Sequence, residues 1–145
     1  MQVNKILNTK GNDVYYTHPE ETVYNAIFKM SELKVGALLV MKRSELVGII
    51  SERDYRNKII LKGRTSKTTE VQEIMTSDVI TVSPNDTVNT CMQIMTDQKI
   101  RHLPVVEGGG VYGVISIGDV VKAVIEQQQV EIDSLRGYIK GGYPA

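Results

Sequence analysis

An internal duplication constrains this chain more than any other feature of its sequence. Shifting the sequence by 65 positions places residues 14–60 on residues 79–125 without a gap. The first-copy residues that meet an identical partner are Val14, Pro19, Thr22, Val23, Met30, Lys34, Leu38, Val40, Gly48, Ile50, Ser51, Asp54 and Ile60. A period longer than a solenoid unit, present only twice, predicts two copies that bury their apolar faces on each other as a pseudo-symmetric pair.

The pattern of apolar and polar residues predicts the order β-α-β-β-α in each copy. In the second copy, residues 79–82 form a short β-branched run, and residues 83–86 supply an N-cap serine, a proline and an acid for a helix start. Two apolar runs around a short polar turn then predict a β-hairpin over residues 37–50, and again over residues 103–115.

The last helix of each copy follows its hairpin directly. In the first copy we expect a helix from Ser51 to about Leu61 that stops at Gly63. In the second copy the helix is expected to start at Ser116 and to continue to Arg136, before Gly137.

These elements predict an α/β (α+β) fold in which two pseudo-symmetric repeats pack through their sheets. Residues 1–69 hold the first repeat, with a helical lead-in at residues 3–7 and a polar linker. Residues 70–137 hold the second repeat, with a similar lead-in at residues 71–75, and residues 138–145 form a C-terminal tail.

The balance of charge narrows the classes of function. Seventeen basic and seventeen acidic side chains cancel, so no global field attracts nucleic acid or an anionic membrane. A small ligand or a protein partner is therefore expected. The chain starts without the apolar region of a signal peptide, and its longest uncharged apolar run, residues 35–41, is too short to span a bilayer. We expect a cytoplasmic protein, which fits the single cysteine, Cys91.

The motifs of common enzymes are missing from the sequence. Residues 63–68 have the wrong spacing for a phosphate-binding P-loop and follow a helix. No G-x-S-x-G nucleophile elbow occurs. Cys91 falls on an apolar helix face, which favours a buried structural thiol over a nucleophile. One cysteine and two histidines exclude a cysteine-rich or histidine-rich metal site. We therefore expect a protein that is not an enzyme and has no catalytic cofactor.

A serine and an aspartate stand three residues apart at both expected strand-to-helix junctions, as Ser51 with Asp54 and as Ser116 with Asp119. Two interpretations account for this spacing. In a capping box, the serine caps the helix and the acid reaches back to the cap amide. In a ligand site, the helix-start amides bind a phosphate and the carboxylate accepts hydrogen bonds from ribose hydroxyls. The two interpretations are compatible with each other.

The copies differ just before the first strand of the hairpin. The second copy has Arg101 and His102 where the first has Gly36 and Ala37. Either the cations lie at a solvated strand end, or Arg101 supplies fixed charge to a phosphate and His102 adds a donor. The second interpretation predicts one better and one poorer phosphate site, with Arg53 compensating in part at the poorer one.

The paired segments GIISERD and GVISIGD, the strand IRHLPVV and the opening V-T-V-S-P-x-x-T-V together resemble the tandem cystathionine-β-synthase (CBS) domain pair, also called a Bateman module. The resemblance covers the chain from about Val3 to Gln127. It implies that an adenine nucleotide binds in the cleft between the copies. AMP is the first candidate, with ADP, ATP, NAD(H) and S-adenosylmethionine as alternatives. It also implies a homodimer and a regulatory role on an unidentified partner protein.

The resemblance assigns roles to individual residues at two related sites. At the first site, Asp119 would hold the ribose, and Ser116, Arg101 and His102 would hold the phosphate. The residues that would enclose the base there are Tyr15, Tyr16, Val35, Gly36 and Ala37. The second site would use Asp54, Ser51, Arg53, Ile80 and Ile100. Gly36 and Ala37 depart from the basic pattern of the family, which weakens the phosphate contacts at the Asp54 site.

A second hypothesis from another class is a structural dimerisation module that binds no ligand. In that case the paired Ser and Asp residues only cap helices. The sequence leaves open which nucleotide binds, whether one or two sites are filled, how a dimer is oriented and which process is regulated.

Overall fold

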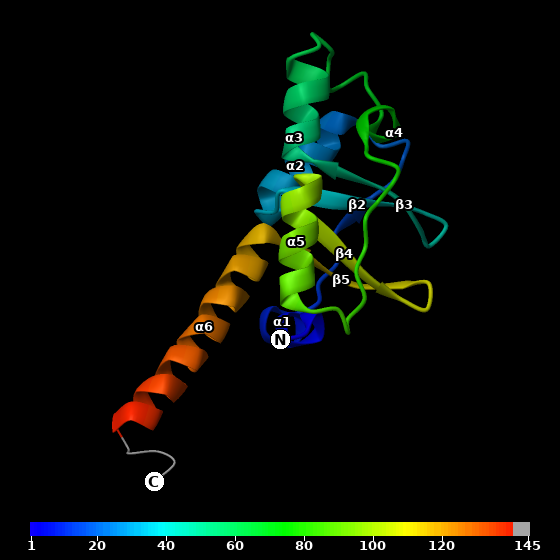
Figure 1. Cartoon of the computed structure of the whole chain (residues 1–145). Coiled ribbons are helices and arrows are strands. Elements are labelled where there is room, and N and C mark those ends of the chain that lie inside the picture. Colours follow the sequence, from blue (N-terminus) through cyan, green and yellow to red (C-terminus); the bar gives the residue numbers. More distant parts are fainter. Residues whose placement is uncertain (141–145) are drawn as a thin grey trace. The chain divides into compact units, whose positions relative to one another are not determined.

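The computed structural model describes residues 1–140 as two compact units, each an α+β assembly (Figure 1). One unit, here the first-repeat unit, contains residues 13–81 with residues 108–111. The other, the second-repeat unit, contains residues 1–12, residues 82–107 and the chain from residue 112 onward. The predicted α+β fold built from two repeats is confirmed.

The two lead-in helices are exchanged between the units. Helix α1 (Val3–Lys10) belongs to the second-repeat unit, where the Val3 amide donates to the Asp86 carbonyl at 2.9 Å. Helix α4 (Val71–Ile74) belongs to the first-repeat unit, where the Val71 amide donates to the Glu21 carbonyl at 2.8 Å. The boundary expected between residues 69 and 70 separates the repeats along the chain. The compact units divide differently, because each lead-in packs on the other repeat.

The first-repeat unit is built on a three-stranded sheet in the order β1-β2-β3. Strand β1 (Tyr16–Thr17) pairs in parallel with β2 (Ala37–Lys42), which pairs antiparallel with β3 (Glu45–Ser51). Helix α2 (Val23–Leu33) joins β1 to β2, and α3 (Glu52–Tyr55) with the π-helical turn Arg56–Ile60 follows β3. The buried core of this unit is formed by Val23, Ala26, Met30, Leu38, Val40, Ile50, Ile59, Val71 and Ile74.

The second-repeat unit repeats this order with fewer strand residues. Helix α5 (Val88–Gln98) precedes the paired strands β4 (His102–Glu107) and β5 (Gly110–Ser116). Helix α6 (Ile117–Lys140) follows β5 and packs on α5 and α1. The buried hydrophobic residues of the second-repeat unit are Val3, Ile6, Leu7, Val82, Val88, Cys91, Met95, Leu103, Val105, Ile115, Val120 and Ala123. In the part of the chain that the structure describes, no helix is long and apolar enough to cross a membrane.

Both predicted hairpins are present, with tight turns of left-handed backbone. Arg43 and Ser44 have φ of 52° and 67°, and Gly108 and Gly109 have φ of 58° and 81°. Two consecutive residues at positive φ match the right-handed twist of the flanking strands. Glycine adopts this conformation without strain, whereas arginine and serine do so less readily. Gly108 and Gly109 of the second copy therefore form the hairpin turn, and Gly110 begins β5.

The strand expected over residues 79–82 was wrong. Only Val82 is bridged, in parallel to Val105. At the equivalent place in the first repeat, the Leu39 amide donates to the Tyr15 carbonyl at 3.2 Å and helps to define β1. Pro104 stands in the position of Leu39 and has no N–H to donate. The second repeat therefore loses a ladder bond and its strand shrinks to one bridge.

The expected end of the last helix was also wrong, because α6 continues through Gly137 to Lys140. Gly63, in contrast, has φ of 65° and follows the end of the helical segment in the first repeat, as predicted. Glycine inside a helix lowers the stability by only about 1 kcal/mol relative to alanine. It therefore ends a helix only where the chain adopts the left-handed conformation. The part of the expected tail from Tyr138 to Lys140 is helical, and residues 141–145 lie outside the described residues.

Strand β3 approaches the segment after α4 closely at Gly48, and a substitution there tests this contact. A Cβ atom at Gly48 would lie 2.5 Å from Met75 Sδ and 3.1 Å from the Thr76 carbonyl oxygen. We expect Gly48→Ala to lower the free energy of unfolding by about 1–3 kcal/mol through overpacking, measured by urea denaturation. Gly137→Ala, at an exposed helical position with open space around it, should instead raise it by up to about 1 kcal/mol. Equal effects of the two changes would contradict this account.

Candidate functional site

The predicted Ser–Asp pair forms a capping box at the start of α3 in the first-repeat unit. The Asp54 amide donates to Ser51 Oγ at 3.3 Å, and the Ser51 amide donates to Asp54 Oδ2 at 3.0 Å. Ser51 Oγ also donates to Asp54 Oδ2 at 3.2 Å. The capping interpretation of this pair is therefore correct in the first repeat.

The same arrangement starts α6 in the second-repeat unit. The Asp119 amide donates to Ser116 Oγ at 3.2 Å, and the Ser116 amide donates to Asp119 Oδ2 at 2.8 Å. Both aspartate side chains are held at the same place relative to their helix because the box fixes each one from two sides. A carboxylate fixed in this way is preorganised for a further polar group.

A lysine contacts each of these carboxylates, but it comes from a different element in each unit. Lys58, one helical turn after Asp54, approaches Asp54 Oδ1 at 3.1 Å and donates to the Ile74 carbonyl at 2.8 Å. Lys10, at the end of α1, donates to Asp119 Oδ2 at 2.7 Å and to the Val114 carbonyl at 2.9 Å. The two copies therefore reach a similar charge balance by unrelated routes.

The environment of Asp119 favours its ionised form. Burial alone would raise the pKa of Asp119, but the hydrogen bond from Lys10, the bond from the Ser116 amide and the charge of Lys10 outweigh it. The pKa of Asp119 therefore lies below its ordinary value. Near neutral pH the start of α6 carries a fixed negative charge next to the Lys10 ammonium group.

A backbone hydrogen bond ties each helix start to the residue before the hairpin. The Glu52 amide donates to the Gly36 carbonyl at 3.1 Å, and the Ile117 amide donates to the Arg101 carbonyl at 2.8 Å. Two first-turn amides of α6, those of Ile117 and Asp119, are thus already bonded. The Gly118 amide lies between them in the first turn of the helix.

The other predicted site residues divide between the two units. Ser116, Asp119, Arg101, His102 and Ile100 belong to the second-repeat unit, where Arg101 is exposed and His102 and Ile100 are half-buried. The predicted residues that belong to the first-repeat unit are Ser51, Asp54, Arg53, Tyr15, Tyr16, Val35, Gly36, Ala37 and Ile80. Each unit therefore brings together its own Ser–Asp pair and the residues at the start of its hairpin.

Tyr15 and Tyr16 of the first-repeat unit are exposed, and Tyr16 lies beside a lysine. Tyr15 and Tyr16 are 37% and 55% exposed, in the same range as Tyr24 at 44% and Phe28 at 57%. Lys29 Nζ lies 5.4 Å from the centre of the Tyr16 ring and donates to the Tyr16 carbonyl at 2.5 Å. Tyr15 and Tyr16, at the start of β1, thus present aromatic surface to solvent, which suits the stacking of a planar base.

Sequence reasoning missed both lysines. Lys58 could have been found, because it follows Asp54 by four residues on a helix, a spacing at which side chains meet. Lys10 has no such local signal, since it is 109 positions away from Asp119 along the chain. Only the exchange of the lead-in helices brings it to the start of α6.

The expectation that Cys91 is a structural thiol agrees with the structure. Its side chain is fully buried, and burial raises the pKa of the thiol to about 11. Among the described residues, no cluster of histidine, cysteine and acidic side chains could hold a metal ion.

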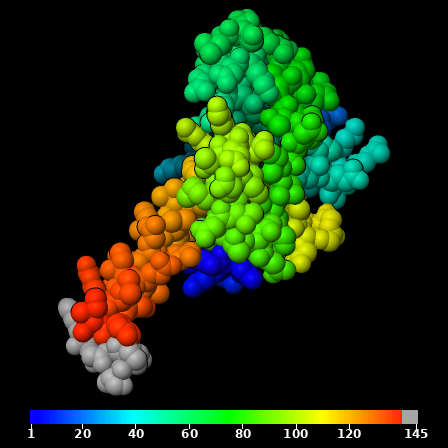
Figure 2. Space-filling view, viewed as in Figure 1, coloured from blue at the N-terminus to red at the C-terminus, as the bar shows by residue number. Residues whose placement is uncertain are grey.

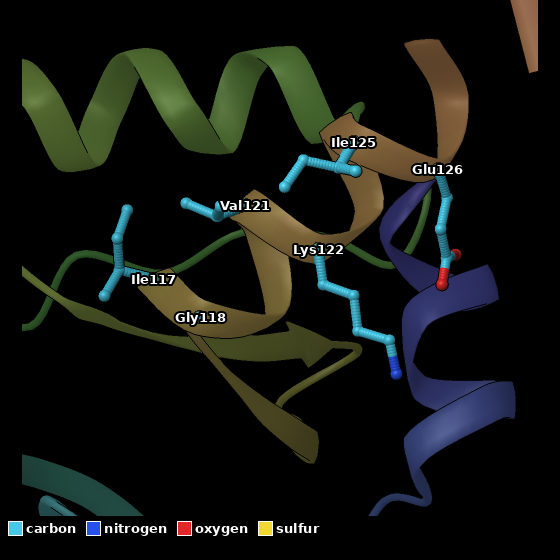
Figure 3. Close-up of a pocket in the computed structure, with 6 residues that line it drawn as sticks. All are labelled: Ile117, Gly118, Val121, Lys122, Ile125 and Glu126. Atoms are coloured by element: carbon cyan, nitrogen blue, oxygen red, sulfur yellow. The ribbon is translucent and has the colours of Figure 1, made fainter. Parts of the chain in front are cut away.

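A shallow groove of about 570 Å³ lies along α6, next to the capping box (Figure 3). Its lining residues are Ile117, Gly118, Val121, Lys122, Ile125 and Glu126. In Figure 3 the apolar side chains Ile117, Val121 and Ile125 point to one side of the helix, and Lys122 and Glu126 point elsewhere. None of the predicted nucleotide-binding residues lines this groove.

Comparison with known proteins gives consistent results. The family model described as "CBS domain" matches twice, at residues 4–60 and 71–126. A curated relative, the CBS domain-containing protein CBSX3, mitochondrial, of Arabidopsis thaliana, is 44% identical over 97% of this chain and 73% of its own length.

Solved structures show the same fold. A protein from Burkholderia ambifaria, described as a putative signal-transduction protein with CBS domains, is 45% identical, with a TM-score of 0.85 over 88% of this chain and 96% of its own. The CBS domain protein PAE2072 from Pyrobaculum aerophilum, solved in complex with AMP, is 24% identical, with a TM-score of 0.73 over 82% of this chain and 89% of its own.

The contact between Lys10 and Asp119 predicts a pH-dependent stability. A carboxylate whose pKa is lowered by folding stabilises the fold above its unfolded pKa, near 4, and loses this effect as pH falls through the folded pKa. We expect Lys10→Met to lower the free energy of unfolding at pH 7 by about 1 kcal/mol or less. The loss should shrink at about pH 3, as the carboxylate becomes protonated in both proteins.

Urea denaturation at both pH values measures this difference. The matched control is Lys5→Met, which removes an exposed lysine from the same helix. Equal losses from the two changes, or a Lys10 loss that does not depend on pH, would contradict the assigned role of Lys10.

Proposed function

Because the chain belongs to the CBS-domain family and contains two CBS domains in tandem, we propose that it is a regulatory module that binds an adenine nucleotide. The ligand state would then be passed to a partner protein. The proposal does not involve catalysis, since the two Ser–Asp pairs are occupied in capping helices and the buried Cys91 thiol is protonated at neutral pH.

The state of the Asp119 carboxylate is the observation that carries this proposal. The Lys10 ammonium group and the Ser116 amide both donate to Oδ2 of this carboxylate, and its side chain is 23% exposed. The Oδ1 atom is therefore available to accept from the hydroxyls of a ribose. The Asp54 carboxylate is 12% exposed and uses both oxygens, Oδ2 with Ser51 and Oδ1 with Lys58. This contrast favours the Asp119 site as the primary one.

Phosphate recognition would use the groups at the start of α6. The Gly118 amide and the positive end of the helix dipole attract an anion, and α6 is a long helix of 24 residues. Ser116 Oγ, Arg101 and His102 would add donors. Lys10 lies within the same group of charges, so an anionic ligand would also interact with its ammonium group.

The base would contact the first-repeat residues Tyr15, Tyr16, Val35, Gly36 and Ala37. AMP is the first ligand we propose, and the complex of the Pyrobaculum aerophilum protein with AMP supports this choice by analogy. ADP, ATP, NAD(H) and S-adenosylmethionine share the adenosine group and are the alternatives. The weaker site at Asp54, Ser51 and Arg53, with Ile80 and Ile100 near the base, would be filled second.

The assembly and location follow as parts of the same proposal. We propose that the module works as a homodimer that acts on a separate regulated protein. A single buried cysteine suits a reducing compartment, and we propose the cytoplasm, although the Arabidopsis relative is named as mitochondrial.

One observation favours a second function, a structural dimerisation module without a ligand. Both Ser–Asp pairs are satisfied as capping boxes, and both carboxylates have a lysine counter-charge within the chain. Because these groups are satisfied without a ligand, stabilising the helix starts is a sufficient role for them. Ligand binding distinguishes the two functions.

The deciding experiment measures AMP binding by calorimetry together with thermal stability. AMP at a hundredfold its dissociation constant should raise the free energy of unfolding by about 2.7 kcal/mol. Asp119→Ala should abolish the binding and cost about 0.5–2 kcal/mol as a lost cap. Asp54→Ala is the matched control, because it removes the equivalent cap and should leave binding at the Asp119 site.

The outcomes separate the two functions. Loss of AMP binding in Asp119→Ala alone supports the sensor. Absence of binding by AMP and by each of the alternative adenosine ligands would support the structural module. Binding that is unchanged in Asp119→Ala would show that the ribose site is assigned to the wrong residue.

A further inference from the structure

The second half of α6 exposes apolar residues that its own unit does not cover. From residue 128 to residue 139 every residue is exposed, and Figure 2 shows this segment in orange to red with its side chains uncovered on the viewed face. Ile132, Leu135 and Ile139 are 42%, 63% and 76% exposed. Helices in water owe most of their stability to packing of an apolar face, so this segment lacks its usual source of stability.

The first half of α6 uses a different face to pack on its own unit. Val120 and Ala123 are buried, and Val124 and Gln127 are half-buried, at the spacing of one helix face. Val121 and Ile125 remain 41% and 59% exposed. At about 100° of rotation per residue, the exposed face lies roughly a third of a turn from the buried one.

The exposed face has the repeat of a coiled coil. Spacings of four and three residues alternate along the series Val121, Ile125, Gln128, Ile132, Leu135 and Ile139. This is the a and d pattern of heptads, with isoleucine at each a position (125, 132 and 139) and leucine at the last d position (135). β-Branched residues at a and leucine at d favour two parallel strands. These six residues are called the seam below, and its first two members, Val121 and Ile125, line the groove in Figure 3.

The charges beside the seam favour a second copy of α6 as the partner and a parallel orientation of the two helices. Glu131 occupies a g position and Arg136 the following e position. In a parallel pair of identical helices, the g side chain of one copy meets the next e side chain of the other, so Glu131 meets Arg136 twice. In the antiparallel pairing that keeps a against d, Glu131 would face Glu131 and Lys122 would face Arg136 of the second copy. Like charges disfavour that arrangement.

We propose that α6 is the interaction surface for a second copy of this chain, and that two α6 helices pair as a parallel coiled coil over residues 121–139. Gln128, at a d position, is the one polar residue among these six positions. Gly137 lies at an outward f position, where the missing side chain removes no contact from the seam. The proposal is independent of nucleotide binding, since none of the proposed ligand residues belongs to the seam.

The first test compares two matched substitutions by sedimentation equilibrium of the full chain without nucleotide. Ile132→Asp places a charge in the seam and should raise the dimer dissociation constant at least about tenfold. Val130→Asp places the same charge two residues away, at an outward position that is 66% exposed, and should leave the constant unchanged. Circular dichroism of both variants checks that the fold is retained.

The second test is a charge exchange that reports the direction of the helices. Glu131→Arg and Arg136→Glu should each weaken the dimer by about threefold to tenfold, because each places like charges across the seam. The double variant restores opposite charges in the parallel arrangement and should recover the original dissociation constant.

Three results would overturn the proposal. A wild-type chain that is monomeric at every attainable concentration excludes a second copy as the occupant. Equal effects of Ile132→Asp and Val130→Asp show that a dimer forms through another face. A double charge variant weaker than both single variants excludes the parallel direction.

Discussion

The turn from the last strand of each repeat into the following helix is the constraint on which the arrangement of the site depends. In both units the first helical amide bonds to the residue before the hairpin, and the serine and aspartate close a capping box. These bonds connect the two ends of the hairpin with the helix start. They fix the aspartate carboxylate without using a ligand, so the chemistry of the site is prepared by the same contacts that stabilise the fold.

The sequence predicted most of the fold because the duplication gives each element twice. The α+β class, the hairpins and the helix starts follow from periodicity and capping residues, which act locally. The failures have equally physical causes. Residues 79–82 have strand composition, but the proline at position 104 removes the amide that the ladder needs. Gly137 resembles a helix end, yet α6 continues, since glycine permits a left-handed turn without requiring one.

The sequence predicted the Ser–Asp pairs of the candidate site but not the lysines that contact their carboxylates. Ser116 and Asp119 are three residues apart at a strand-to-helix junction, so their contact could be inferred from spacing alone. The Lys10 contact depends on which repeat the lead-in helix packs against, and the sequence shows an apolar helix without showing its neighbour. The same contact makes the repeats unequal: Asp119 keeps an oxygen available and Asp54 does not.

The exchange of the lead-in helices has a consequence for synthesis on the ribosome. The first-repeat unit can complete its core once the segment through α4 has emerged, because nearly all of its chain lies before residue 82. Helix α1 is made before the first-repeat unit but finds its partners only after residues 82–88 are available, where the Val3 amide donates to the Asp86 carbonyl and the Val88 amide donates to the Met1 carbonyl. Chains form such long-range contacts late, since the loop that must close is long. Helix α1 therefore stays unpaired while residues 13–81 fold, and the nascent chain exposes an amphipathic helix during that interval.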